Sequence, residues 1–208
     1  MLHIENLMNR FPQLATCKDP LMRAVECIVR CYKHGGMLLV CGNGGSCADA
    51  EHIAGELMKG FCKKRQLAAN EVSALTDVHH EIGLLLAKNL QQGLRTVCLS
   101  SLPALSTAFA NDVDPVLVFA QQAYTYAKAD DVFLGISTSG NAKNVICAAV
   151  AAKAKGATTI GLTGKDGGDM KDLFDIVIIA PETETYRIQE LHVPLYHALC
   201  LEVEDMLF

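Results

Sequence analysis

The stretch LLVCGNGGSCADAEHIAGEL, residues 38–57, joins an apolar run to a glycine-rich loop and then to a segment that alternates polar and apolar residues. A short continuous apolar run is typical of a strand buried on both faces, so we expect a strand over 37–41. The segment after the loop predicts a helix over 46–60. Glycines at such a junction let the backbone approach an anion, which the free N–H groups of the helix can bind. The stretch therefore predicts a strand, a candidate phosphate-binding loop and a helix in succession.

The same alternation of strand and helix continues along the chain. Apolar runs predict further strands over 96–100, 131–137, 158–163 and 175–180, and helical patterns lie over 115–128, 142–155 and roughly 185–207. This pattern predicts an α/β fold with a parallel, doubly wound sheet, whose ligands bind at the carboxyl ends of the strands. Residues 62–95 depart from the pattern and predict an amphipathic helical insertion within a single domain that spans residues 1–208.

Composition and charge exclude several classes of partner. The chain has 208 residues, half of them hydrophobic, which is enough for one sizeable core. Its net charge is −5 and it has no basic stripe, so we expect no nucleic-acid partner. The most apolar stretch contains Lys153 and Lys155, so we expect no membrane span. Nine scattered cysteines without a Cys-x-x-Cys pair, and no visible export signal, predict reduced thiols in a cytoplasmic protein.

Three predicted strands end in loops of similar chemistry, CGNGGS (41–46), GISTSGN (135–141) and LTGKDGG (162–168). The second loop adds three hydroxyl groups, from Ser137, Thr138 and Ser139. None is a familiar nucleotide motif, because the first lacks the last glycine of G-x-G-x-x-G and the third has Asp166 where a Walker loop has Ser or Thr. Glycines that only form turns are the alternative. Several such loops together favour a small molecule that carries a phosphate.

Two predicted helices carry polar faces. His52 and Glu56 lie four residues apart, and Gln189 and His197 share one face of the last helix. Such groups could bind zinc or nickel, or serve as acid and base, although either pair alone is more often a set of ordinary surface or capped residues. We interpret His79–His80 and the charged run Lys63–Lys64–Arg65 as surface groups.

Taken together, these segments resemble the sugar isomerase (SIS) family, and within it the sedoheptulose 7-phosphate isomerases. The segments that carry the resemblance are CGNGGSCADAEHIAGEL, LSTAFANDVD, DVFLGISTSGN, IGLTGKDGG and YRIQELHVPLYH. The resemblance implies a three-layer, flavodoxin-like fold with a five-stranded sheet. It also implies a homotetramer whose active sites lie between subunits, and interconversion of a ketose and an aldose phosphate through an enediol.

The resemblance also implies roles for individual residues. Glu56 is then the catalytic base and His197 the catalytic acid. Zinc is the implied cofactor, with the ligands His52, Glu56, Gln189 and His197. The implied substrate-binding residues are Asn43, Gly44, Gly45, Ser46, Asn111, Asp112, Ser137, Thr138, Ser139 and Gln189.

Three departures from the family pattern bear on specificity. Ala142 stands where these isomerases usually have Ser, Tyr186 stands where Asp is more usual, and segment 62–95 is longer than the pattern. We expect this segment to pack over the site or at a subunit interface. Two alternatives stay open, namely an isomerase of another sugar phosphate and a non-catalytic phosphosugar-binding or scaffold protein. The complete His/Glu/Gln/His set favours an enzyme that converts sedoheptulose 7-phosphate to the aldose heptose 7-phosphate.

Overall fold

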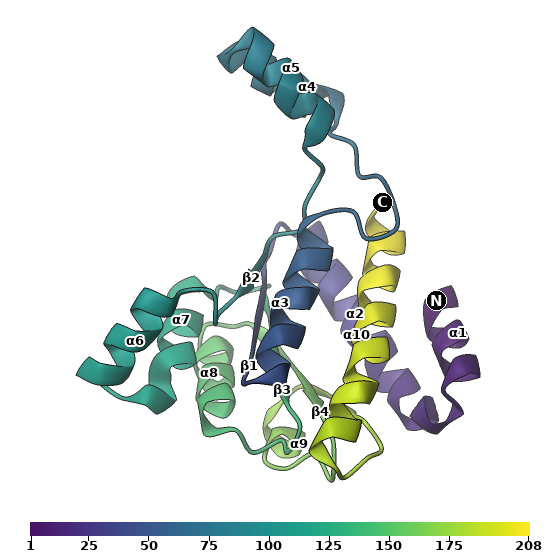
Figure 1. Cartoon of the computed structure of the whole chain (residues 1–208), viewed down its shortest axis with the longest axis vertical. Coiled ribbons are helices and arrows are strands. Elements are labelled where there is room, and N and C mark those ends of the chain that lie inside the picture. The colour runs from purple at the N-terminus through teal and green to yellow at the C-terminus, as the bar shows by residue number, and fades with distance from the viewer.

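The sheet of the computed structural model, which describes residues 1–208, has five parallel strands in the order β2-β1-β3-β4-β5. The strands are β1 (Leu38–Gly42), β2 (Thr96–Cys98), β3 (Val132–Ser137), β4 (Thr158–Thr163) and β5 (Ile176–Ile179). Each coincides with a predicted apolar run, and all residues of β1 and β3 are buried. The predicted fold class is therefore confirmed (Figure 1).

The strand order places a ligand crevice beside β1. From β1 the chain goes first to β2 on one side and later to β3 on the other, so the direction of winding reverses between β1 and β3. Ligands of open α/β sheets bind at such a switch point, outside the carboxyl ends of the strands. Here β1 ends at Gly42, β3 at Ser137 and β4 at Thr163, and these are the three loops that the sequence singles out.

One face of the sheet is covered by three long helices, α2 (Lys18–Lys33), α3 (Gly45–Met58) and α10 (Thr185–Leu207). Helix α10 packs on both α2 and α3, so the last segment of the chain lies beside the first loop helix (Figure 1). The chain begins with α1 (Leu2–Arg10) and the 3-10 turn η1 (Pro12–Cys17), which pack outside this layer. This arrangement lets α3 and α10 present side chains to one another near the carboxyl edge of the sheet.

The other face is covered by α7 (Val118–Tyr126), α8 (Lys143–Ala154) and the short α9 (Met170–Leu173). Alanines of α8 allow this helix to lie close to the sheet, where Phe133 and Phe174 pack with ring centroids 6.3 Å apart. Helix α6 (Pro103–Asp112) and the 3-10 turn η2 (Pro115–Leu117) precede this layer, and α6 has no buried residue. None of the helices is both long and apolar enough to cross a membrane.

Segment 62–95 leaves the body of the molecule. It contains α4 (Ala69–Val78) and α5 (His80–Asn89), which form a hairpin that projects beyond the end of α3 (Figure 1). The two arms of its stem are joined, because the Gln92 N–H donates to the Arg65 carbonyl at 2.7 Å. The hairpin does not cover the groups of its own chain at the sheet edge, and its place over a site or at a subunit interface stays a prediction.

Arg65 contradicts the prediction that the run Lys63–Lys64–Arg65 is a surface face. Its side chain is fully buried, and Nε contacts Glu204 Oε1 at 2.8 Å. Its Nη1 donates to the Leu57 carbonyl at 2.7 Å, at the end of α3. The prediction is wrong because a run of cations is solvated by default, whereas here the chain turns across the end of α10 and meets a buried carboxylate there.

Candidate active site

The first loop turns at Gly44 directly into the start of α3. Gly44 has φ +56°, a conformation that side chains rarely adopt, and α3 begins at the next residue. A Cβ on Gly45 would collide with the side-chain amide of Gln189, so Gln189 on α10 lies directly against this loop. The side-chain amide of Asn43 pairs reciprocally with that of Asn144, each bond being 2.9 Å. The structure thus brings the first loop, α8 and the start of α10 together.

The second and third loops pack on each other. Gly140 has φ +69°, and the space that a Cβ would need there is filled by the Gly167 carbonyl. The Gly140 carbonyl accepts a hydrogen bond from the Met170 N–H at 3.1 Å. Asn141 Oδ1 accepts another from the Asp169 N–H at 2.9 Å. The loop that carries Ser137–Ser139 is therefore held in place by its neighbour.

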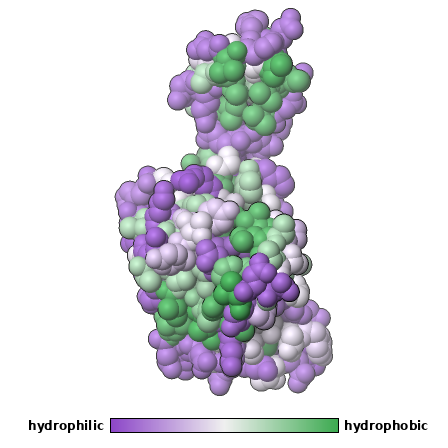
Figure 2. Space-filling model, turned by 90° about the vertical axis from the view of Figure 1, so that its left-hand side faces the viewer, coloured by the Kyte–Doolittle hydropathy of each residue, from purple (hydrophilic) through white to green (hydrophobic).

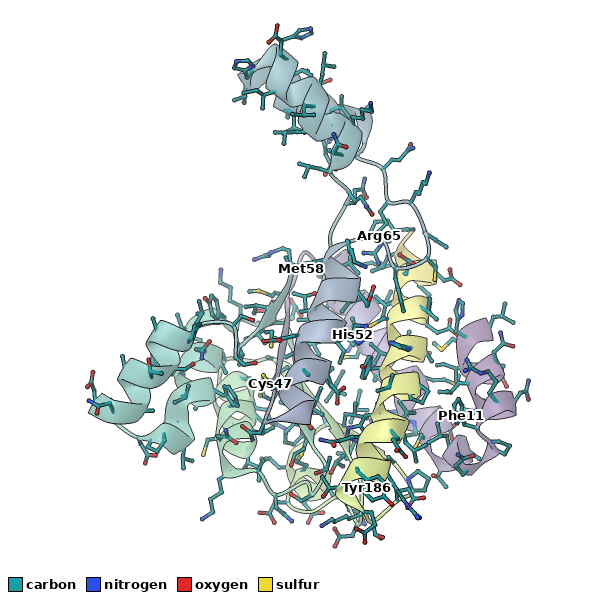
Figure 3. The ribbon with its side chains drawn as sticks, in the orientation of Figure 1. Phe11, Cys47, His52, Met58, Arg65 and Tyr186 are labelled. Atoms are coloured by element: carbon teal, nitrogen blue, oxygen red, sulfur yellow. The ribbon has the colours of Figure 1, made fainter.

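Glu56 is held by His52 on its own helix and by Lys59, the residue that follows the helix. Its Oε1 lies 3.2 Å from His52 Nε2, and its Oε2 lies 2.8 Å from Lys59 Nζ. The Glu56 side chain is only 14% exposed, whereas Lys59 is largely in solvent. His52 lies between α3 and α10, as Figure 3 shows, and its Nδ1 contacts the Tyr196 hydroxyl at 3.0 Å. These contacts orient both side chains that the sequence places four residues apart.

His197 joins this group from α10. Its ring centroid lies 5.0 Å from that of His52 and 5.0 Å from that of Tyr196. Burial lowers the pKa of His197, and the neighbouring His52 lowers it further, against the opposing effect of Glu56. His197 Nε2 is buried and has no hydrogen-bond partner. Burial and the neighbouring His52 thus favour the neutral form of this imidazole, and its Nε2 is shielded from solvent.

A cavity of about 580 Å³ opens beside His197, between α1 and α10. Arg10 of α1 and Glu190, Val193 and Pro194 of α10 are among its lining residues. His52, Glu56 and the strand-end loops do not line this cavity, so it lies on the α1 side of His197 and not over the rest of the group.

Two further side chains belong to the site although the sequence analysis did not name them. Tyr196 contacts His52, and Asp49 lies near both, with a pKa that burial raises and that interactions with Tyr196 and His52 lower in part. Asp49 precedes His52 by three residues, so helical spacing could have placed it on the same face. Nothing in the local sequence marks Tyr196, because its contact depends on how α10 packs on α3.

The predicted zinc ligands do not gather around one point. No group of three or more His, Cys, Asp or Glu side chains is arranged to hold a metal ion. Gln189 faces Gly45, while His197 lies eight residues further along α10, a rise of about 12 Å. The donor atoms are of the kind that zinc uses, but their arrangement does not fit a bound ion, and no chemical step is derived through one.

Asn111 and Asp112 lie apart from these groups. They end α6 beside α7, both are exposed, and Asn111 Nδ2 donates to Asp112 Oδ1 at 2.9 Å. Figure 1 places α6 on the opposite side of β1 from α10. Their part in substrate binding stays a prediction.

Comparisons with known proteins agree on one family. The family model described as the SIS domain matches residues 3–107 and 92–164. Curated relatives include phosphoheptose isomerases from Helicobacter hepaticus (36% identical, covering 93% of this chain and 85% of that one) and Nitratiruptor sp. (39% identical, covering 85% and 81%). The structure is similar to that of the phosphoheptose isomerase GmhA from Neisseria gonorrhoeae, with a TM-score of 0.73 and 32% identity over 97% of this chain and 98% of that one. A phosphoheptose isomerase from Francisella tularensis gives a TM-score of 0.75 and 25% identity over 97% and 94%.

Proposed function

The chain belongs to the SIS domain family, and on that premise we propose that it converts D-sedoheptulose 7-phosphate to D-glycero-D-manno-heptose 7-phosphate. Its similarity to phosphoheptose isomerases identifies it as a phosphosugar isomerase that interconverts a ketose and an aldose. The observation that carries the proposal is the position of Glu56. Its carboxylate lies beside His52 and His197 on the helix that begins in the glycine loop.

Phosphate recognition is assigned to the backbone and to hydroxyl groups. The start of α3 offers the positive end of its helix dipole, although the N–H groups of Ser46 and Cys47 already donate to the carbonyls of Asn43 and Gly44. Ser137, Thr138 and Ser139 offer hydroxyl donors at the end of β3. An anion bound there places the other end of a sugar chain along α3, toward His52 and Glu56.

Glu56 then acts as the base of an enediol mechanism. Its carboxylate removes a proton from C1 of the ketose while the C2 carbonyl oxygen takes the N–H proton of His197, which produces the enediol. Return of the proton from Glu56 to C2, while the C1 hydroxyl proton passes to His197, gives the aldose and restores both side chains. His197 is therefore the proton donor in the first step and the proton acceptor in the second.

The first experiment measures turnover of purified protein with a panel of five- to seven-carbon sugar phosphates. We expect the ketoheptose 7-phosphate to be the best substrate, and Glu56→Gln to lower kcat by about 10³-fold with little change in KM. Glu51→Gln, an exposed carboxylate on the same helix, is the matched control and should retain full activity.

Each alternative has its own outcome in this experiment. Faster turnover of a smaller sugar phosphate would assign another substrate to the same site. Sugar phosphate binding without turnover of any panel member would favour a non-catalytic binding protein, and full activity of Glu56→Gln would remove Glu56 as the base.

Zinc at His52, Glu56, Gln189 and His197 is a separate proposal. It is supported by the unpartnered Nε2 of His197 alone. Because the donors do not converge in this structure, it requires Gln189 to turn away from Gly45 and the other three side chains to move closer together. We expect purified protein to hold close to one zinc per chain by elemental analysis, and His197→Ala to lose it. Full activity at a far lower metal content would contradict a catalytic zinc.

A homotetramer with sites between subunits is likewise a proposal. It is supported by the position of Asn111 and Asp112, which the fold of one chain leaves away from Glu56. A neighbouring chain could supply this pair to the site.

A further inference from the structure

The α4–α5 hairpin has almost no core of its own. Gly83 is its one buried residue, and a Cβ there would lie 2.5 Å from the Leu75 carbonyl oxygen. The two helices therefore approach each other across a glycine. Val72, Leu75 and Leu86 are half-buried, whereas the other large apolar side chains of the hairpin are exposed. The hairpin also packs on no other helix or strand of the body to any extent, as Figure 1 shows.

Large apolar side chains are exposed on this hairpin. Val78 is 88% exposed, Leu85 61%, Ile82 52%, Leu84 51% and Leu90 48%. Figure 2 shows apolar atoms gathered on the projecting part of the molecule. No charged residue occurs in the sequence IGLLLA, residues 82–87. Depletion of charge around exposed apolar side chains is typical of the centre of a protein–protein interface.

The stem holds the hairpin away from its own body. Arg65 joins the stem to Glu204 of α10, and the Leu94 N–H donates to the Leu57 carbonyl at 3.0 Å. The Gly60 N–H donates to Gln91 Oε1 at 2.8 Å, which ties the second arm of the stem to the chain that leaves α3. These bonds fix the orientation of the hairpin relative to the body of the molecule. In this orientation no part of its own chain covers the exposed apolar side chains.

We propose that this face binds the α4–α5 hairpin of a second copy of the same chain, so that the four helices form a bundle about a two-fold axis. Ile82 and Leu85 share one side of α5, whereas Leu84 points to the other side. Without Leu84, the exposed parts of the side chains amount to roughly 400 Å² per hairpin, and together with the half-buried Val72, Leu75 and Leu86 two hairpins approach the total of about 1,000 Å² at which specific interfaces begin. In a two-fold interface the same patch serves both copies, which a self-complementary apolar face satisfies. Two antiparallel helix pairs packed in this way form a four-helix bundle. The proposal does not depend on the substrate or on the catalytic residues.

Light scattering on the full-length chain over a dilution series tests the proposal. We expect a mass that is a multiple of the 22.4 kDa chain. The variant Ile82→Glu/Leu85→Glu should dissociate at the hairpin contact, with an apparent dissociation constant raised by at least about 100-fold. The control Asn70→Glu/Ser73→Glu adds the same two charges at exposed polar positions of α4 and should keep the mass of the unchanged chain.

Hydrogen exchange of the unchanged chain provides a test that needs no variant. Isolated ten-residue helices are marginal in water, so α4 and α5 should be protected in the oligomer and exchange much faster after dilution to the monomer. A chain that is monomeric at every concentration would overturn the proposal, as would an unaltered mass of Ile82→Glu/Leu85→Glu. Equal exchange of the hairpin before and after dilution would overturn it as well, and would assign its face to another partner.

Discussion

His52 is held from two sides, by Glu56 on its own helix and by Tyr196 on α10. The first contact follows from the spacing of four residues along α3, which any helix at this position would produce. The second requires α10 to pack on α3 in one particular rotation, and the same rotation brings His197 against His52. Local periodicity therefore predicts the His52–Glu56 pair, but it does not predict the contacts of His52 with Tyr196 and His197.

His192 makes the stability of the fold depend on pH. It is completely buried, its Nε2–H donates to the Thr163 carbonyl at 3.2 Å, and burial lowers its pKa to about 4. The unfolded chain binds a proton near pH 6.5, whereas the folded chain stays neutral until about pH 4, so the free energy of unfolding decreases as the pH falls through this window. We expect this residue to remove about 2 kcal/mol between about pH 7 and about pH 5.

Urea unfolding of His192→Gln at these two pH values checks that expectation. The variant should lose most of this pH dependence, because glutamine can donate to the same carbonyl and does not titrate. The exposed His34→Gln is the control and should keep the dependence of the unchanged chain. If the free energy of unfolding depends on pH equally in His192→Gln and in the unchanged chain, groups other than His192 cause that dependence.

Arg65 and Glu204 connect three elements, namely α3, the stem of the hairpin and α10 (Figure 3). Burial opposes ionisation of Glu204, but the N–H groups of Cys62 and Phe61, together with Arg65, outweigh it and lower the pKa of this carboxyl. Arg65 in turn donates to the carbonyls of Leu57 and Glu56 at the end of α3. The helix that carries Glu56 is therefore stabilised from its carboxyl end by a side chain of the segment that follows.

Arg65→Met should lower the free energy of unfolding by about 3–5 kcal/mol, because it leaves the Glu204 carboxylate buried without its cation. Denaturant unfolding at neutral pH measures this loss. Lys64→Met removes a neighbouring exposed cation and should change stability by less than about 0.5 kcal/mol. If both variants change the free energy of unfolding by similarly small amounts, Arg65 contributes no more to stability than a surface residue, as the sequence predicts.

The hairpin shows the limit of pattern analysis at the level of elements. The sequence of this segment predicts helices, and the two helices α4 and α5 form. The spacing of the apolar residues does not show whether these residues face the body of the molecule or solvent. In a helix that packs on its own sheet, such positions point inward. Here the stem directs both helices away from the sheet, so the same positions form an exposed face.

At the scale of the whole molecule, the apolar runs predict all five strands to within two residues at each end. These runs are reliable because a central parallel strand is covered by helices on both faces, so nearly every position in it is apolar. The glycine and serine loops follow these strands directly, and their meeting at one edge of the sheet follows from the parallel arrangement. The α/β fold class and the location of a candidate phosphate site therefore follow from the order of residues along the chain.

The residues around His52 show what local sequence determines and what it does not. Strands, helices, strand-end loops and the His52–Glu56 pair are local features, because periodicity and glycine act over a few positions. The contact of Gln189 with Gly45, the support of His52 by Tyr196, the burial of Arg65 and the exposure of the hairpin were decided by tertiary packing. Each depends on which faces of distant segments meet, and short-range periodicity carries no information about that choice.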